Sequence, residues 1–278
     1  MKMKTIDEAL EFYDIDKKYK KVCYQCVEDI NKNFDASKLL EKIVIKLFKD
    51  DFTTIKKLWK FENINDLLGE NINSFITNLI ILLGYNFHRI NMNELKFDNE
   101  QISIHKKRVK ECFESDLKNR RYKAIRLSQM LWAIYFIRGR IIEIGNLQFE
   151  YDSDDIIKIH IPKNTDFDIL KSKESIKQSK EIIKNTFRIN DFKYVCNSWL
   201  LSNQIYEMID KNTNISKFHD LFKVKDGEDC EKDILNFVYR LDKCDDYSLL
   251  ETDTTLQLQI KNYLKSGKKI YLGLGVLK

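Results

Sequence analysis

His160 and Glu150 are the side chains of this sequence whose types and positions best suit acid–base chemistry. His160 lies opposite the isoleucines of an alternating run, 157–161. An imidazole titrates near neutrality, so His160 could take a proton from an attacking amine. Glu150 ends another alternating run and could serve as a base or as a substrate anchor. The structural alternatives are a hydrogen-bonded histidine and a solvated carboxylate at a strand end.

Ser198, Tyr151 and the cysteines are further candidates. Ser198 or Tyr151 could protonate a departing thiolate, and Cys196, on the same strand face as Ser198, could be a nucleophile. A strand cysteine without a histidine partner is usually a small apolar side chain. Cys23 and Cys26 form a lone Cys-x-x-Cys pair, whereas zinc needs about four ligands. We therefore expect no metal.

The turn between Pro162 and a predicted helix near Ser172 could bind an anion. A helix start offers unpaired backbone amides and the positive end of the helix dipole, which suit a pyrophosphate. Lys163 and Asn164 lie in this turn, and Ser172 and Ser175 begin a narrow face of small residues. Positive charge comes from lysines at 171, 173 and 177. The alternative is an ordinary crossover helix, with serines packed on the sheet and lysines in water.

The elements that position these side chains span residues 141–201, which read as strand, strand, helix, strand. The apolar residues change parity at Gly145, which predicts a bulge. Pro162 ends the second alternating run because proline has no amide hydrogen to donate. A helical pattern follows over 172–187. Residues 192–201 are apolar on both faces, which is typical of a doubly buried strand.

The rest of the chain is mostly helical in pattern. Residues 5–138 predict helices, of which the apolar one over 75–83 ends at Gly84. Residues 202–278 mix short elements and include a predicted strand over 218–224. A final strand over 270–277 carries Gly273 and Gly275 on one face. Two glycines there leave space for another backbone or for a ligand.

Three motifs in this order resemble a bacterial two-domain acyltransferase family. They are IGNLQFE at 144–150, IHIP at 159–162 and CNSWLL at 196–201. The resemblance continues through NISKF at 214–218, TLQ at 255–257 and GLG at 273–275, and it is weak before residue 132. Members have a helical acyltransferase domain followed by a domain resembling the GNAT (Gcn5-related N-acetyltransferase) fold. Asn146 departs from an expected arginine, the glycines near the C-terminus are fewer than expected, and the usual acetyl-CoA signature is absent.

The resemblance implies an α+β protein, with a helical N-terminal domain over 1–138 packed on a GNAT-like mixed α/β domain over 139–278. It implies acyl transfer from acyl-CoA to an amine or similar nucleophile by direct attack, with CoA threaded between splayed strands. Glu150 or His160 would be the base and Ser198 the acid. The CoA pyrophosphate would lie at the turn formed by the following residues: Pro162, Lys163, Asn164, Ser172 and Ser175.

Composition limits the partners. The chain of 278 residues is 33% charged and 43% hydrophobic, and its formal charge is only +5. That net charge is too small to indicate nucleic acid as a binding partner. No run approaches the roughly 18 apolar residues of a membrane span, and no secretory apolar segment begins the chain. We expect a cytoplasmic protein with reduced thiols, acting on a small-molecule or peptide acceptor. The basic run 118–126 is a solvated surface or a site for an acidic group.

Two other functions stay open. The absent phosphate-loop signature and Asn146 are consistent with a non-catalytic GNAT-like module that binds CoA, another anion or a protein partner. A peptide- or protein-binding scaffold without a small ligand is the second. Thermal shift with CoA compounds and a pull-down would separate these possibilities from an enzyme.

Overall fold

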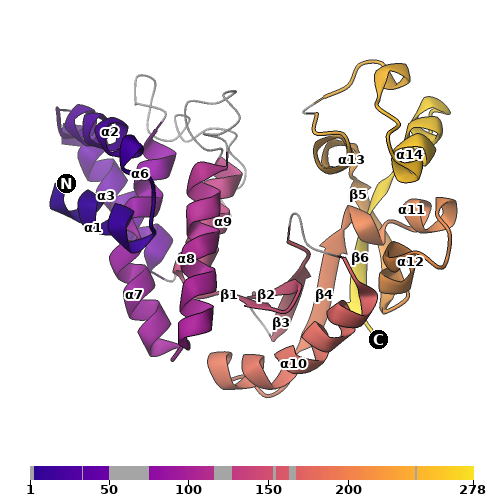
Figure 1. The fold of residues 1–278 in the computed structure, drawn as a ribbon, viewed down its shortest axis with the longest axis horizontal. Coiled ribbons are helices and arrows are strands. Elements are labelled where there is room, and N and C mark those ends of the chain that lie inside the picture. The colour runs from indigo at the N-terminus through magenta and orange to yellow at the C-terminus, as the bar shows by residue number, and fades with distance from the viewer. Residues whose placement is uncertain are drawn as a thin grey trace. The chain divides into compact units, whose positions relative to one another are not determined.

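The computed structural model describes residues 3–32, 34–49, 75–115, 127–152, 155–162, 167–241 and 243–278. The chain divides into two compact units, Met1–Ile142 and Glu143–Lys278. This division falls inside the first strand, whereas the domains proposed from the sequence, 1–138 and 139–278, meet just before it. The first unit is helical and the second combines helices with a sheet, so the protein is α+β (Figure 1).

The helices of the first unit are α1 (Met3–Phe12), α2 (Lys20–Lys32), α3 (Phe34–Phe48), α6 (Ile76–Leu83), α7 (Tyr85–Glu94), α8 (Asn99–Glu114) and α9 (Leu127–Ile137). Helix α6 is central, because all of its residues from Ile76 to Leu82 are buried. It ends at Gly84, as the sequence predicts. Gly84 keeps a right-handed backbone, with φ −78°, so left-handed geometry is not its role. A Cβ there would lie 2.4 Å from the ring of Phe48, which makes close packing the reason for glycine.

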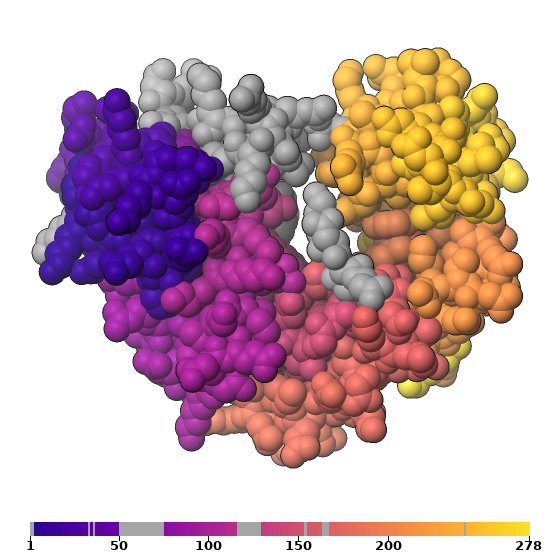
Figure 2. Space-filling view, viewed as in Figure 1, coloured from indigo at the N-terminus to yellow at the C-terminus, as the bar shows by residue number. Residues whose placement is uncertain are grey.

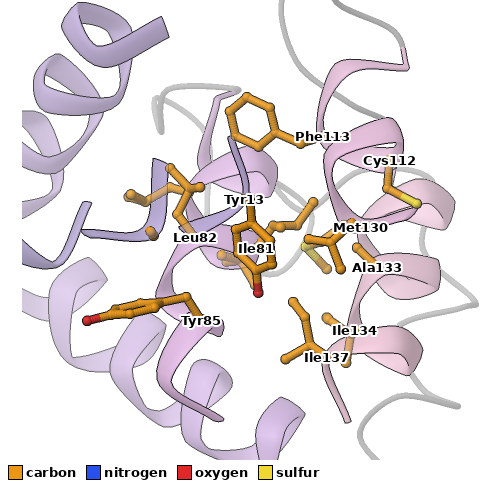
Figure 3. Packing of buried hydrophobic residues seen from close by; sticks show 14 of the residues in the cluster. Tyr13, Ile81, Leu82, Tyr85, Cys112, Phe113, Met130, Ala133, Ile134 and Ile137 are labelled. Atoms are coloured by element: carbon orange, nitrogen blue, oxygen red, sulfur yellow. The ribbon is translucent and has the colours of Figure 1, made fainter. Parts of the chain in front are cut away.

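The core of this unit contains a buried pair of imidazoles. His88 on α7 and His105 on α8 are fully buried, and their ring centroids are 5.7 Å apart. The Tyr13 hydroxyl lies 3.1 Å from Nδ1 of His88. Figure 3 shows Tyr13 within the aliphatic cluster, near Ile81 and Met130. Among the described atoms His88 Nε2 has no hydrogen-bond partner, so this ring is held neutral in an apolar setting.

The second unit is built on a six-stranded sheet in the order β1-β2-β3-β4-β6-β5. The strands are β1 (Ile141–Ile144), β2 (Leu147–Tyr151), β3 (Ile156–His160), β4 (Lys193–Ser198), β5 (Phe222–Asp229) and β6 (Tyr271–Leu277). Strands β3 and β4 run parallel, whereas the β2–β3, β4–β6 and β5–β6 pairs are antiparallel. The predicted strand over 218–224 is wrong at its start, because Phe218 lies in helix α12 (Asn214–His219) and β5 begins at Phe222.

Gly145 lies in a two-residue turn between β1 and β2, not in the predicted bulge. Its φ is +60°, a left-handed conformation that glycine adopts without strain. A Cβ at this position would lie 2.2 Å from the hydroxyl oxygen of Ser175. The change of parity in the sequence therefore marks a hairpin turn that a helix closely approaches.

Gly145→Ala is expected to destabilise the second unit by more than Gly267→Ala. Both glycines have positive φ, but nothing lies within 4 Å of a Cβ at Gly267. The control therefore measures the backbone cost alone, about 1–2 kcal/mol, and Gly145→Ala adds the clash with Ser175. Chemical denaturation of both variants measures the difference. Equal losses of unfolding free energy would contradict the close approach.

Helix α10 (Ile169–Phe187) packs on one face of the sheet, where the Ser179 hydroxyl contacts that of Tyr194. It follows β3 and buries Ser172, Ser175, Ile176, Ser179 and Ile183. Farther along the chain lie α11 (Asn203–Met208), α13 (Glu231–Val238) and α14 (Thr255–Lys265). A second apolar cluster joins α11, α13 and α14, and Figure 2 shows the orange-to-yellow C-terminal part of the chain closely packed. No helix in the described part of the chain is both long and apolar enough to cross a membrane.

Gly273 of β6 admits a neighbouring backbone, and Gly275 admits neighbouring side chains. A Cβ at Gly273 would lie 2.0 Å from the carbonyl oxygen of Leu201, and one at Gly275 would lie 2.7 Å from the Leu201 side chain. Leu201 belongs to a short 3-10 helix, η2 (Trp199–Leu201), that directly follows β4. The sequence leaves two uses for the space beside these glycines, a neighbouring backbone or a ligand. In the structure the backbone of Leu201 fills the space beside Gly273.

Candidate functional site

Strands β3 and β4 are paired along only part of their length. The register runs from Ile156 with Lys193 to Lys158 with Val195 and ends there. Both strands continue, β3 to His160 and β4 to Ser198. Past the last pair, the facing edges of the two strands are therefore separated. This splay lies inside the sheet, because β2 flanks β3 and β6 flanks β4.

The backbone of β4 presents an amide to this splay. The amide of Lys193 donates to the carbonyl oxygen of Asp155, 2.9 Å away, so it faces β3. Backbone groups alternate sides along a strand, so the amide of Asn197 faces the same way as that of Lys193. Asn197 lies beyond the last β3–β4 pair. Its amide is thus placed to donate to a group bound in the splay.

Glu150 and His160 form a hydrogen-bonded pair beside the splay. Nε2 of His160 lies 2.7 Å from Oε2 of Glu150. The Glu150 side chain is 4% exposed and that of His160 is 28% exposed. An ionised carboxylate only accepts hydrogen bonds, so Nε2 carries the hydrogen and Nδ1 is the proton-accepting atom of the neutral ring. This is the arrangement by which a carboxylate orients a general base.

Register explains why the two side chains meet. Glu150 pairs with Lys158 and Gln148 with His160, so all four lie on one face of the β2–β3 ladder. Lys158 Nζ lies 3.7 Å from Oε1 of Glu150 and 2.8 Å from Oδ2 of Asp152. Sequence reasoning missed Lys158, although its place two residues before His160 signals the same strand face. The lysine places a positive charge beside the buried carboxylate.

Ser198 is not brought to that pair. Lys158 pairs with Val195, so Val195 and Asn197 share the face of His160, while Cys196 and Ser198 point to the opposite face. The Ser198 hydroxyl accepts the amide of Leu200 at 3.2 Å and caps η2. Its hydrogen remains able to donate. Ser198 therefore borders the splay from the other side of the sheet.

The cysteines are buried thiols. Burial raises the pKa of Cys196 to about 12, so this residue is protonated at neutral pH and is a poor nucleophile. Cys23 and Cys26 are fully buried in α2, and burial raises the pKa of each to about 12. Over the residues that the structure describes, no three His, Cys, Asp or Glu side chains gather as metal ligands.

The first amides of α10 are already bonded. Asp168 is the N-cap of the helix, and its Oδ1 accepts the amides of Leu170 at 2.7 Å and Lys171 at 3.0 Å. The amides of Lys171 and Leu170 hold the pKa of Asp168 below its usual value. Pro162 is half-buried just after β3, as the sequence predicts for the end of that strand. Lys163 and Asn164 lie outside the described residues, as does the basic run 118–126.

Ser172 and Ser175 are buried against the β1–β2 turn. The Ser175 hydroxyl accepts the amide of Asn146 at 3.1 Å and donates to its side-chain oxygen at 3.1 Å. The Asn146 side-chain nitrogen donates to the Ser172 hydroxyl at 3.1 Å. These hydroxyls hold α10 on the sheet and are 0% and 2% exposed. Both hydroxyls hydrogen-bond to Asn146, the residue that stands where the resemblance implies an arginine.

Comparisons with known proteins agree with this architecture. Residues 141–277 match the model of the GNAT-like C-terminal domain family. The crystal structure of an acyltransferase in complex with decanoyl-CoA superposes with TM-score 0.75 at 15% identity, covering 98% of this chain and 86% of that one. Another, with CoA and 10C-teicoplanin, gives TM-score 0.74 at 15% identity, covering 98% and 87%. Among curated proteins, no sequence matches this one.

The shared fold and the splayed parallel pair lead to the same assignment as the motifs of the sequence. Residues 141–277 form a GNAT-like C-terminal domain, and with its helical N-terminal unit the chain shares the fold of these acyltransferase structures.

Proposed function

We propose that the protein is an acyltransferase that moves an acyl group from acyl-CoA to a small-molecule amine or similar nucleophile. The observation that carries the proposal is the splay between β3 and β4, with the Glu150–His160 pair on one of its faces. The thioester arm of the co-substrate would lie in the splay. Crystal structures of acyltransferases with the same fold contain decanoyl-CoA and teicoplanin, which supports this class of donor and a small-molecule acceptor.

The proposed reaction is a direct attack. His160 takes a proton from the acceptor amine at Nδ1 while Glu150 holds Nε2, and the amine nitrogen bonds to the thioester carbonyl carbon. The amide of Asn197 stabilises the charge that develops on the carbonyl oxygen. The carbon–sulfur bond then breaks, and the leaving thiolate takes a proton from Ser198. That role is compatible with the opposite face, because a ligand in the splay can be reached from both sides of the sheet. Ser198 regains a proton from solvent and His160 releases its proton to solvent, so both groups return to their starting forms.

The pyrophosphate is proposed to lie at the start of α10, near Pro162, Lys163 and Asn164 and the backbone of Ser172 and Ser175. The buried hydroxyls of the two serines are engaged with Asn146, and the amide of Ser172 already donates to the carbonyl oxygen of Asp168. The groups that would contribute are therefore the first amides of the helix, those of Leu170 and Lys171. A bound pyrophosphate would have to displace the Asp168 carboxylate from the first amides. The position of the Asp168 carboxylate is therefore expected to differ between the CoA-free and CoA-bound protein.

Asp168→Asn is expected to tighten CoA binding several-fold. Asparagine caps a helix as well as aspartate does, so stability is retained while the like charge beside the pyrophosphate is removed. Isothermal titration with CoA at low salt measures the change. Asp98→Asn is the matched control, because Asp98 caps α8 of the helical unit in the same way. Unchanged affinity in Asp168→Asn would argue against a pyrophosphate at this helix start.

Thermal shift tests the proposed donor. A ligand present at about 100 times its dissociation constant stabilises the folded protein by about 2.7 kcal/mol. We expect such a shift with CoA and with acetyl-, octanoyl- or decanoyl-CoA, and release of free thiol when an acceptor amine is added. No shift with any CoA compound would overturn the proposal.

A non-catalytic CoA- or anion-binding module is the second candidate. It is favoured by Asn146, which stands where the resemblance implies an arginine and is held by the buried serines of α10. A thermal shift with CoA but no thiol release across a panel of amines would support this candidate over the enzyme.

A further inference from the structure

The two faces of the sheet in the second unit are used differently. Helix α10 contacts one face through Ser179 and Tyr194, and η2 lies on the same face, with Leu201 over Gly273. Residues that pair across strands share a face, and the β4–β6 register puts Tyr194 and Gly273 on the same one. The proposed acid–base pair lies on the other face, which is called the open face below.

Beyond the acid–base pair, the open face carries an apolar strip made of Val195, Leu274 and Val276. Val195 of β4 pairs with Val276 of β6, and Asn197 pairs with Leu274. Leu274 and Val276 are 38% and 45% exposed. Neighbouring apolar side chains that stay exposed on one strand face suit the apolar surface of a ligand. The strip begins at the Asn197 position, whose backbone amide is proposed to contact the thioester.

Two lysines of β5 border the apolar strip on its far side. Lys223 pairs with Val276 and Lys225 with Leu274, so both lysines stand on the open face. Both are exposed, and neither forms an ion pair with any residue that the structure describes. Asp226 follows Lys225 but pairs with Gly273, so it lies on the other face. Two ammonium groups next to an apolar surface suit an anionic group of an apolar ligand.

Charge is therefore divided across the open face. The carboxylates of Glu150 and Asp152 lie at the β2 end, near Lys158, and the two further lysines lie at the β5 end. Free amines carry a proton near neutral pH, so the amine of an acceptor is attracted to the β2 end and an anion to the β5 end. Strand β5 is three strand spacings from β3, which is at least about 14 Å.

We propose that the acceptor is an amine whose apolar body carries an anionic group about 14 Å from the nitrogen. The apolar strip would lie under the body, and Lys223 and Lys225 would bind the anion. The inference rests on the proposed acyl transfer and names its acceptor class. These side chains would touch the acceptor away from the reacting atoms, so they determine which amine is selected rather than the chemical step.

The test uses two synthetic tetrapeptides, Ala-Leu-Ala-Leu with a free C-terminal carboxylate and the same peptide with a C-terminal amide. An extended tetrapeptide spans about 13 Å and places both leucines on one face. Their binding to the full chain saturated with CoA is measured by NMR titration, and their turnover by thiol release from octanoyl-CoA. The wild-type protein is expected to favour the carboxylate roughly fivefold, at the upper end for an exposed ion pair, and less at about 1 M salt.

Variants of the open face separate the two parts of the site. Lys223→Ala and Lys225→Ala should each reduce the preference for the carboxylate, and Lys225→Glu should abolish it. Leu274→Ser should weaken the binding of both peptides alike and leave the preference unchanged, because it removes apolar contact and no charge. All three residues are exposed, so the variants are expected to fold.

Two substitutions elsewhere in the unit are the matched controls. Lys184 is an exposed lysine of α10, which packs on the other face, and Leu249 is 80% exposed outside the sheet. Lys184→Ala and Leu249→Ser should bind both peptides as the wild type does. Equal binding of the two peptides by the wild type, binding of neither, or a preference that survives in Lys225→Glu would overturn the acceptor class and leave the proposed function standing. Failure of every CoA compound to bind the wild type would overturn both.

Discussion

His160→Ala is expected to lower kcat by about 10²–10⁴-fold, the usual contribution of a general base. The imidazole is the partly exposed member of a pair whose other member, Glu150, is almost completely buried. Alanine removes the proton acceptor and leaves the splay between β3 and β4 in place. CoA affinity should therefore change little, and steady-state kinetics of thiol release would show the loss in kcat rather than in binding.

His219→Ala is the control for this variant. His219 is a histidine of the same unit whose Nε2 donates to Oδ1 of Asn203, 3.1 Å away, and whose ring stacks on Tyr206. It belongs to α12, not to β3. A rate within twofold of wild type in His160→Ala would remove the imidazole from the mechanism.

Glu150→Gln separates orientation from direct catalysis. Glutamine keeps the shape of the side chain but not its charge, so it no longer fixes the hydrogen of His160 on Nε2. If Glu150 acts only through His160, the substitution slows the wild-type enzyme and has little further effect in the His160→Ala background. Additive losses would instead make Glu150 an independent base.

Acid is expected to destabilise the helical unit through His88. Burial, with further contributions from His105 and Lys106, puts the pKa of His88 well below its usual value. The histidine pKa in the unfolded chain is about 6.5. Below that pH the unfolded chain therefore binds a proton at His88 that the folded chain does not bind. Stability is fully present above pH about 6.5 and falls below it, by up to about 1.4 kcal/mol per pH unit for this residue.

Urea denaturation at pH 5.5 and 7.5, with hydrogen exchange to report each unit separately, measures this effect. His88→Phe should lose most of the difference between the two pH values, although it also loses the contact with Tyr13 and so starts from a lower stability. His88→Gln is the second variant, should the phenylalanine not be accommodated. A pH difference of the same size in whichever variant folds would show that another group is responsible.

Local periodicity predicted the elements around the site well. The alternation over 157–161 and the single proline gave β3 and its end, and the spacing over 172–187 gave most of α10. The short apolar run that begins at Phe218 has no such pattern, and its prediction as a strand was wrong at the start. Phe218 lies near the end of a helix, and the strand follows it. Strand and helix cannot be told apart in so few residues.

What the sequence did not reveal depends on contacts between distant segments. The Glu150–His160 bond follows from the register of β2 on β3, in which Gln148 lies opposite His160 and Glu150 opposite Lys158. The face of Ser198 follows from the β3–β4 register, across a helix of 19 residues. The buried pair His88 and His105 joins elements that no repeat of the chain relates.

The partial pairing of β3 and β4 has a cost for the protein without its ligand. It creates two unsatisfied edges in the middle of a sheet, and exposed strand edges are templates for pairing with other chains. An occupant of the splay would shield those edges. Storage stability and resistance to self-association should therefore rise with the concentration of whichever compound fills the splay, including a compound that undergoes no reaction there.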